Sequence, residues 1–165
     1  MGEISTGTLV NDLAAALKLR GQMMATAESC TGGLIAGACT DVSGSSDWFE
    51  RGFITYSNAA KHELIGVPMA LIEQHGAVSE PVARAMAEGA LAHSPAQFAV
   101  AVTGVAGPTG GSADKPVGTV WFGWATPDGV FTEHQRFDGD RAAVRQATVR
   151  HALAGLLQRL PKPNT

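Results

Sequence analysis

The feature that most constrains the fold is a short buried segment that runs directly into a small polar turn and then into a helical pattern. Residues 23–27 have the short, mostly apolar character of a buried strand, residues 28–33 (Glu-Ser-Cys-Thr-Gly-Gly) form the turn, and residues 34–40 have helical spacing. In such a unit the turn lies at the C-terminal edge of a sheet, and the first N–H groups of the helix favour anions. The sequence therefore predicts a ligand-binding edge close to residue 28.

Helical and strand patterns alternate along the rest of the chain. The predicted helices cover residues 8–20, 34–40, 58–65 (capped by Asn58), 69–75, a stretch that opens at Ser79, and 140–160, and the predicted strands cover residues 23–27, 52–57, 98–102, 117–126 and 130–137. The last two strands read as a hairpin joined at Pro127-Asp-Gly. This interleaving predicts an α/β fold, a single layered domain with a mixed parallel and antiparallel sheet flanked by helices.

Length and composition agree with one domain over residues 1–165, and residues 161–165 read as a frayed tail. A net charge of −3 without any run of Lys or Arg argues against nucleic-acid binding. No apolar run is long enough to cross a membrane and no signal segment is apparent, so the chain is expected to be cytoplasmic.

Metal and disulfide chemistry are not indicated. The five histidines are scattered without ligand spacing, and the two cysteines, Cys30 and Cys39, are expected to stay reduced. Cys30 is a rival nucleophile because a helix N-terminus lowers a thiol pKa, but a small buried thiol is the more frequent role for such a residue.

Three polar turns, at residues 28–33, 44–46 and 103–112, are expected to converge on one edge of the sheet, where ligands bind in open α/β folds. The glycine-rich turn at 103–112 lacks the Lys-Ser/Thr of a Walker loop, and no Gly-x-Gly-x-x-Gly follows a strand. Neither ATP nor a dinucleotide is therefore indicated, and an exposed glycine loop without a ligand is an equally good interpretation.

A possible catalytic stretch lies between Gly44 and Lys61, with the serine pair Ser45-Ser46 and the only tyrosine, Tyr56. A lysine acts as a base only when its surroundings lower its pKa, and burial beside apolar neighbours has that effect. A nearby serine would then have a proton acceptor. On these residues alone, a turn, a strand residue and a solvated lysine remain the more frequent interpretation. In the last helix, Arg141 and Arg145 share a face and form either a phosphate clamp or a solvated surface.

Several segments together resemble the CinA C-terminal domain family, whose stand-alone members are nicotinamide-nucleotide amidases. The matching segments, in family order, are Thr26-Ala-Glu-Ser-Cys-Thr-Gly-Gly, Gly44-Ser-Ser, residues 48–61 (Trp-Phe-Glu-Arg-Gly-Phe-Ile-Thr-Tyr-Ser-Asn-Ala-Ala-Lys), Gly76-Ala-Val-Ser-Glu, residues 103–111 (Thr-Gly-Val-Ala-Gly-Pro-Thr-Gly-Gly) and Lys115-Pro-Val-Gly-Thr-Val. The resemblance extends from about residue 9 to residue 157, which it implies as the core of the single domain. It further implies hydrolysis of nicotinamide mononucleotide to nicotinate mononucleotide and ammonia, a step of pyridine-nucleotide recycling, without a metal or an organic cofactor.

Carried onto this chain, the resemblance implies Ser46 as nucleophile, Lys61 as general base and Tyr56 as a group that holds or relays the proton. Which serine attacks, Ser46 or Ser29, stays open. The implied substrate contacts are Ser29, Thr31, Gly32, Gly33, Thr103, Gly104, Gly107 and Arg145, with Arg145 the favoured cation and the backbone N–H groups receiving either the phosphate or the oxyanion.

Two alternatives to this amidase remain, namely a pyridine-nucleotide-binding module in which Glu63 or Glu50 holds Lys61 protonated, and an amidase for another small amide. Many relatives carry a further N-terminal domain, and any activity of that domain is expected to be absent here. The hairpin residues Trp121, Phe122 and Trp124 offer more aromatic surface than one small sheet face is expected to bury, which predicts a homodimer.

Overall fold

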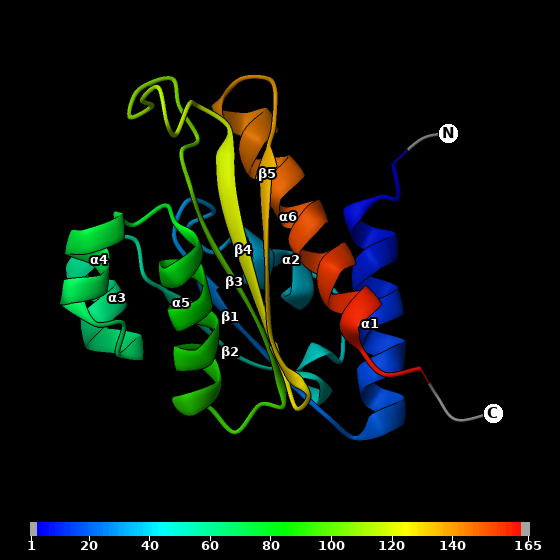
Figure 1. Cartoon of the computed structure of the whole chain (residues 1–165). Coiled ribbons are helices and arrows are strands. Elements are labelled where there is room, and N and C mark those ends of the chain that lie inside the picture. Colours follow the sequence, from blue (N-terminus) through cyan, green and yellow to red (C-terminus); the bar gives the residue numbers. More distant parts are fainter. Residues whose placement is uncertain (1–2, 163–165) are drawn as a thin grey trace.

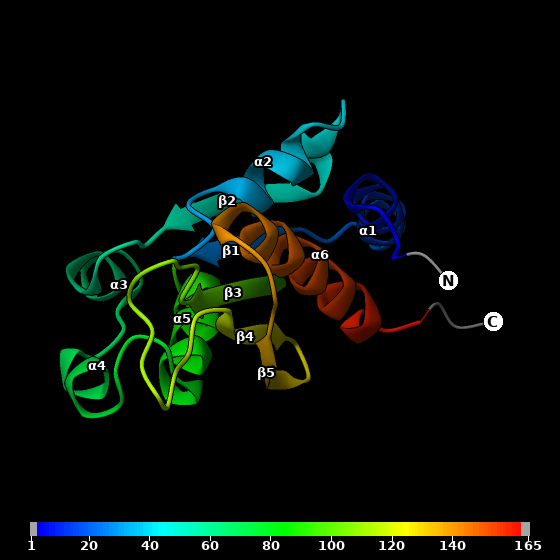
Figure 2. The same ribbon diagram turned by 90° about the horizontal axis from the view of Figure 1, so that it is seen from above.

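The computed structural model describes residues 3–162 and has a mixed five-stranded sheet between two layers of helices (Figures 1 and 2). Within these residues the strands are β1 (Met24–Glu28), β2 (Phe49–Ile54), β3 (Phe98–Gly104), β4 (Thr119–Thr126) and β5 (Gly129–Arg136). The helices are α1 (Thr6–Arg20), α2 (Leu34–Thr40), α3 (Asn58–Ile65), α4 (Met69–His75), α5 (Glu80–Ala92), α6 (Arg141–Arg159) and a short 3₁₀ helix, Ser45–Asp47. The predicted α/β class is confirmed.

The strand order β2-β1-β3-β4-β5 determines which loops meet. β1 pairs in parallel with β2 and β3, and its last residue, Glu28, lies beside Ile54 and Val102, the register partners near the ends of those strands. β4 and β5 are antiparallel, and Arg136 at the end of β5 pairs with Thr119 at the start of β4. The loops after β1, β2 and β3 and the start of α6 therefore gather at one edge, whereas the residues before β2 lie at the opposite edge.

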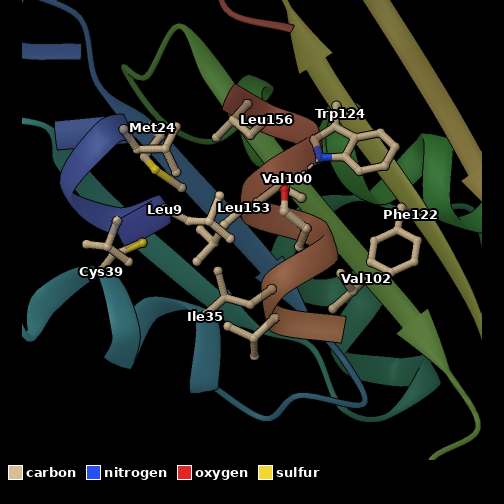
Figure 3. Close-up of a cluster of buried hydrophobic side chains, with 14 of the residues drawn as sticks. Leu9, Met24, Ile35, Cys39, Val100, Val102, Phe122, Trp124, Leu153 and Leu156 are labelled. Carbon is tan, nitrogen blue, oxygen red and sulfur yellow. Dashed lines mark hydrogen bonds between the residues drawn. The ribbon is translucent and has the colours of Figure 1, made fainter. Parts of the chain in front are cut away.

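Helices α1, α2 and α6 cover one face of the sheet, and α3, α4 and α5 lie on the other (Figure 2). The larger buried cluster fills the space between the sheet and the first three of these helices (Figure 3). All five residues of β1 are buried, as expected for a central parallel strand that is covered on both faces. None of the helices in the described part of the chain combines the length and the apolar character that a membrane span requires.

Two local predictions were wrong. β2 begins at Phe49 rather than at residue 52, because it is an edge strand and its polar residues Glu50 and Arg51 interrupt the apolar pattern. The N-cap of α3 is Ser57 rather than Asn58, since the Ser57 hydroxyl accepts a hydrogen bond from the N–H of Ala60.

The aromatic hairpin is better covered than the sequence suggested. Phe122 and Trp124 are fully buried, their rings stack at 5.6 Å, and the Trp124 indole N–H donates to the carbonyl of Ala152 in α6 at 3.0 Å. Figure 3 shows both rings facing the helix that carries Leu153 and Leu156. Two of the three aromatic residues from which a homodimer was inferred are therefore covered within the chain, whereas Trp121 is only partly buried and lies against His134; the homodimer stays a prediction.

Candidate functional site

The turn after β1 is fixed by a buried carboxylate. Glu28 accepts hydrogen bonds from the Thr31 hydroxyl at 2.6 Å and from the backbone N–H groups of Ile35 and Ala36 at 2.9 and 3.0 Å. These N–H groups belong to the first turn of α2, so the protein's own anion occupies the helix start. This arrangement holds Ser29, the residue after Glu28, at the C-terminal edge of the sheet.

Lys61 reaches the same edge from the first turns of α3. Its ammonium nitrogen, Nζ, lies 3.0 Å from the Ser29 hydroxyl oxygen, 3.0 Å from the Thr55 carbonyl and 3.2 Å from the Tyr56 carbonyl. Ser29 is 8% exposed and Lys61 is 1% exposed. A lysine that is almost completely buried thus lies within hydrogen-bond distance of a serine hydroxyl at the edge where the loops gather.

Burial changes the acid–base behaviour of this lysine. Loss of solvent lowers the pKa of Lys61 from its ordinary 10.5 to about 8. Within residues 3–162, no carboxylate forms an ion pair with Lys61; Glu50 pairs with Arg51. A neutral Lys61 amine has two N–H groups for the carbonyls of Thr55 and Tyr56, which leaves its lone pair facing the Ser29 hydroxyl.

The Ser29–Lys61 pair opens into a cleft with a volume of about 380 Å³. Its lining comes from the turn after β1, the segment that joins β2 to α3, the residues before α5, the loop after β3 and the first residue of α6: Ser29, Cys30, Tyr56, Asn58, Lys61, Ala77, Val78, Gly104, Val105, Ala106, Gly107, Thr109, Gly110 and Arg141. This volume suits a small molecule.

Five of the predicted site residues line this cleft, namely Ser29, Lys61, Tyr56, Gly104 and Gly107. Tyr56 contacts Lys61 through its main-chain carbonyl, while its hydroxyl lies 3.5 Å from Nη2 of Arg141. The side chain of Tyr56 is therefore directed toward Arg141, and the residue is 62% exposed.

The other predicted substrate contacts do not line the cleft. Arg145 donates to the carbonyls of Cys30 and Thr31 at 3.1 and 3.2 Å, so it braces the turn that carries Ser29. The Thr103 hydroxyl donates to the Ala77 carbonyl at 2.9 Å. Thr31, whose hydroxyl is bound to Glu28, and the glycines that follow it, Gly32 and Gly33, are likewise not among the residues that line the cleft.

The structure does not bring Ser46 to this site. Ser46 is exposed in the 3₁₀ helix that precedes β2, whereas Lys61 contacts the residues that follow β2. The strand between them is six residues long, which corresponds to about 20 Å at the usual rise per residue. Ser46 and Lys61 therefore lie at opposite edges of the sheet, and the turn at 44–46 does not join the other two polar turns.

The rival nucleophile Cys30 also lines the cleft, but burial raises the pKa of its thiol to about 12. A thiol with this pKa carries almost no thiolate near neutral pH, and thiolate is the nucleophilic form. In the described residues, no group of three or more His, Cys, Asp or Glu side chains is arranged to hold a metal ion.

Sequence reasoning gave Arg141 no separate role. It paired Arg141 with Arg145 because the two share a helix face, but only Arg141 lines the cleft. The available signal was its position as the first residue of the last helix, directly after a hairpin that returns to the binding edge. Asn58 and the Ala77-Val78 segment were also missed.

Comparison with known proteins shows the family of this chain. Residues 6–160 match the CinA C-terminal domain. The chain belongs to the CinA C-terminal domain family. Two family members named nicotinamide-nucleotide amidohydrolase PncC are similar to it over most of their length: the protein from Enterobacter agglomerans is 60% identical (90% of this chain, 92% of that protein), and the protein from Pseudomonas putida is 58% identical (92% and 94%).

The family fold is also known from solved structures. The crystal structure of the competence/damage inducible protein CihA from Agrobacterium tumefaciens superimposes with a TM-score of 0.92 at 46% identity, covering 96% of this chain and 97% of that one. The two folds therefore agree over nearly the whole of this CinA-domain chain.

Proposed function

We propose that this protein is a nicotinamide-nucleotide amidohydrolase, which hydrolyses the carboxamide of nicotinamide mononucleotide to nicotinate mononucleotide and ammonia in pyridine-nucleotide recycling. The observation that carries the proposal is the 3.0 Å contact between the Ser29 hydroxyl and the buried Lys61 amine inside a cleft that suits a small molecule. The names of the similar PncC proteins supply the substrate class.

In the proposed reaction Ser29 is the nucleophile and Lys61 is the general base. The Ser29 oxygen attacks the carboxamide carbon while its proton passes to the lone pair of Lys61. The tetrahedral intermediate collapses when Lys61 returns this proton to the leaving nitrogen, which departs as ammonia and leaves an ester on Ser29. A water molecule, deprotonated by Lys61, then hydrolyses the ester, releases nicotinate mononucleotide and restores the serine.

The oxyanion of the intermediate needs N–H donors that are already in place. The backbone N–H of Cys30, adjacent to Ser29, and those of Ala106 and Gly107 come from residues that line the cleft. These groups are the proposed donors, in place of the α2 start, whose N–H groups are bound to Glu28.

The test is ammonia release from nicotinamide mononucleotide by the full chain and by two serine variants. Ser29→Ala is expected to lower kcat by at least about 10³-fold, because it removes the nucleophile, and to retain binding of nicotinate mononucleotide. Ser46→Ala is the matched control and should stay within about twofold of the parent, as an exposed serine distant from Lys61. Absence of ammonia release by the parent protein would refute the proposed activity. Loss of turnover in Ser46→Ala alone would refute the assignment of Ser29.

A further inference from the structure

The charge of the cleft identifies the end at which an anionic group would bind. Among the described residues that line it, Lys61 and Arg141 are the basic side chains and none is Asp or Glu. Lys61 is committed to Ser29 and to the carbonyls of Thr55 and Tyr56. Arg141 is therefore the cation available to a ligand in the cleft.

The guanidinium of Arg141 is held in place but is not saturated. Its Nη1 donates to the Gly107 carbonyl at 2.9 Å, and its Nη2 lies 3.5 Å from the Tyr56 hydroxyl. A guanidinium has five N–H donors in a planar fork that matches the oxygens of a phosphate. The contact with Gly107 fixes the orientation of the fork and leaves donors for a ligand.

Tyr56 sets the distance between this cation and the reacting serine. Its main-chain oxygen lies 3.4 Å from the Ser29 hydroxyl oxygen, and its phenolic oxygen contacts Arg141. The Ser29 hydroxyl and the Arg141 guanidinium therefore contact the two ends of one tyrosine residue. In nicotinamide mononucleotide the carboxamide and the phosphate likewise lie at the two ends of the molecule, with the pyridine ring and the ribose between them.

We propose that Arg141 binds the 5′-phosphate and is the residue by which the enzyme prefers the mononucleotide to the riboside. This inference rests on the proposed function for the identity of the substrate. Arg145, one helical turn further along α6, does not share the role, because its guanidinium is bound to the carbonyls of Cys30 and Thr31 and it does not line the cleft.

The first experiment compares kcat/KM for nicotinamide mononucleotide and for nicotinamide riboside in the parent protein and in Arg141→Gln. Loss of a charge-assisted contact to phosphate should lower the mononucleotide-to-riboside ratio by roughly 10- to 100-fold. Arg150→Ala, on the same helix but paired with Glu3, is the control and should leave the ratio and the activity unchanged. Equal losses on both substrates, or no loss, would overturn the assignment.

A second experiment does not depend on turnover. Binding of ribose 5-phosphate is measured by calorimetry with Ser29→Ala and with the double variant Ser29→Ala/Arg141→Gln, and ribose serves as the control ligand. The double variant should bind ribose 5-phosphate roughly 10- to 100-fold more weakly. Equal affinities would refute the role of Arg141, even if the parent protein is an active amidase. If the parent protein has no amidase activity but the double variant still binds ribose 5-phosphate more weakly, the phosphate site is supported and only the proposed reaction is refuted.

Discussion

Replacing Lys61 by Met should abolish turnover and at the same time stabilise the fold at neutral pH. Met has a similar unbranched length and no charge, so it fills the buried site without an ionised group to desolvate. The wild-type lysine is 1% exposed, and burial lowers the pKa of its ammonium from 10.5 to about 8. That lowered pKa means that the folded protein binds this proton less tightly than the unfolded chain does.

The lowered pKa of Lys61 gives the magnitude and the sign of its effect on the free energy of unfolding. A change from 10.5 to about 8 corresponds to about 3 kcal/mol at about 1.4 kcal/mol for each pH unit. Below pH 8 both states are protonated and the fold carries this whole cost; between pH 8 and 10.5 the unfolded chain binds more protons, so wild-type stability rises with pH. Lys61→Met removes the cost but leaves the Thr55 carbonyl without its donor, which costs about 1 to 2 kcal/mol.

The variant should therefore be about 1 to 2 kcal/mol more stable than wild type at pH 7 and less stable than wild type above pH 10.5. Urea denaturation of both proteins from pH 7 to 10.5 measures this difference. Burial raises the pKa of the Cys39 thiol to about 12 in both proteins, so its titration cancels. The Cys30 thiol is coupled to the Lys61 charge, so both proteins are compared in a Cys30→Ala background. The exposed Lys18→Met variant is the control and should show a difference that does not depend on pH. A Lys61→Met difference that is flat over this range would refute the lowered pKa.

Three further outcomes are expected. Because the proposed reaction needs the neutral amine of Lys61, kcat/KM should rise with pH through an apparent pKa near 8, set by the burial of Lys61, and then level off; a profile that is flat between pH 6 and 9 would contradict Lys61 as the base. Arg145→Ala should lower kcat with little change in KM, since it frees the turn that carries the nucleophile, and restoration of most of the rate by Lys at this position would show that one donor is enough. Gly155→Ala should lower the free energy of unfolding in urea by about 1 to 3 kcal/mol because its methyl group would overlap the Trp124 indole, whereas Gly37→Ala, with open space around the added atom, should raise it by about 0.5 to 1 kcal/mol.

Much of the fold could be predicted because its signals are local. The helices 34–40 and 69–75 were predicted with the bounds that the structure has, and the helix that ends at Ile65 was predicted with its cap one residue too late, since glycines or polar caps mark their ends. β2 was misplaced because an edge strand need not alternate and its central residues are charged. Burial of the hairpin aromatics by α6 was not predictable from the hairpin, because it depends on a helix that follows much later in the chain.

The candidate site shows where sequence spacing misleads. Ser46 is closer to Lys61 in the sequence than Ser29 is, yet Ser29 makes the contact across 32 residues. In a parallel pair, residues that follow the two strands lie at the same edge, whereas residues that precede and follow one strand lie at opposite edges. Ser29 follows β1 and Lys61 follows β2, while Ser46 precedes β2. Applied to the predicted strands, this rule would have favoured Ser29.

In the proposed mechanism, the stability cost of burying Lys61 and the capacity of Lys61 to act as a base both follow from the same lowered pKa. With a pKa of about 8, roughly one molecule in ten has a neutral Lys61 at pH 7, against roughly one in 3,000 at the ordinary value of 10.5. The neutral fraction of Lys61 is thus raised roughly 300-fold. The same pKa change lowers the free energy of unfolding by about 3 kcal/mol at pH 7, because a ratio of roughly 300 corresponds to about this energy. A substitution that admits water to the lysine would raise its pKa, stabilise the protein at pH 7 and slow the reaction together. The carbonyls of Thr55 and Tyr56 serve both sides of this balance, because they give the amine its hydrogen-bond partners and direct its lone pair toward Ser29.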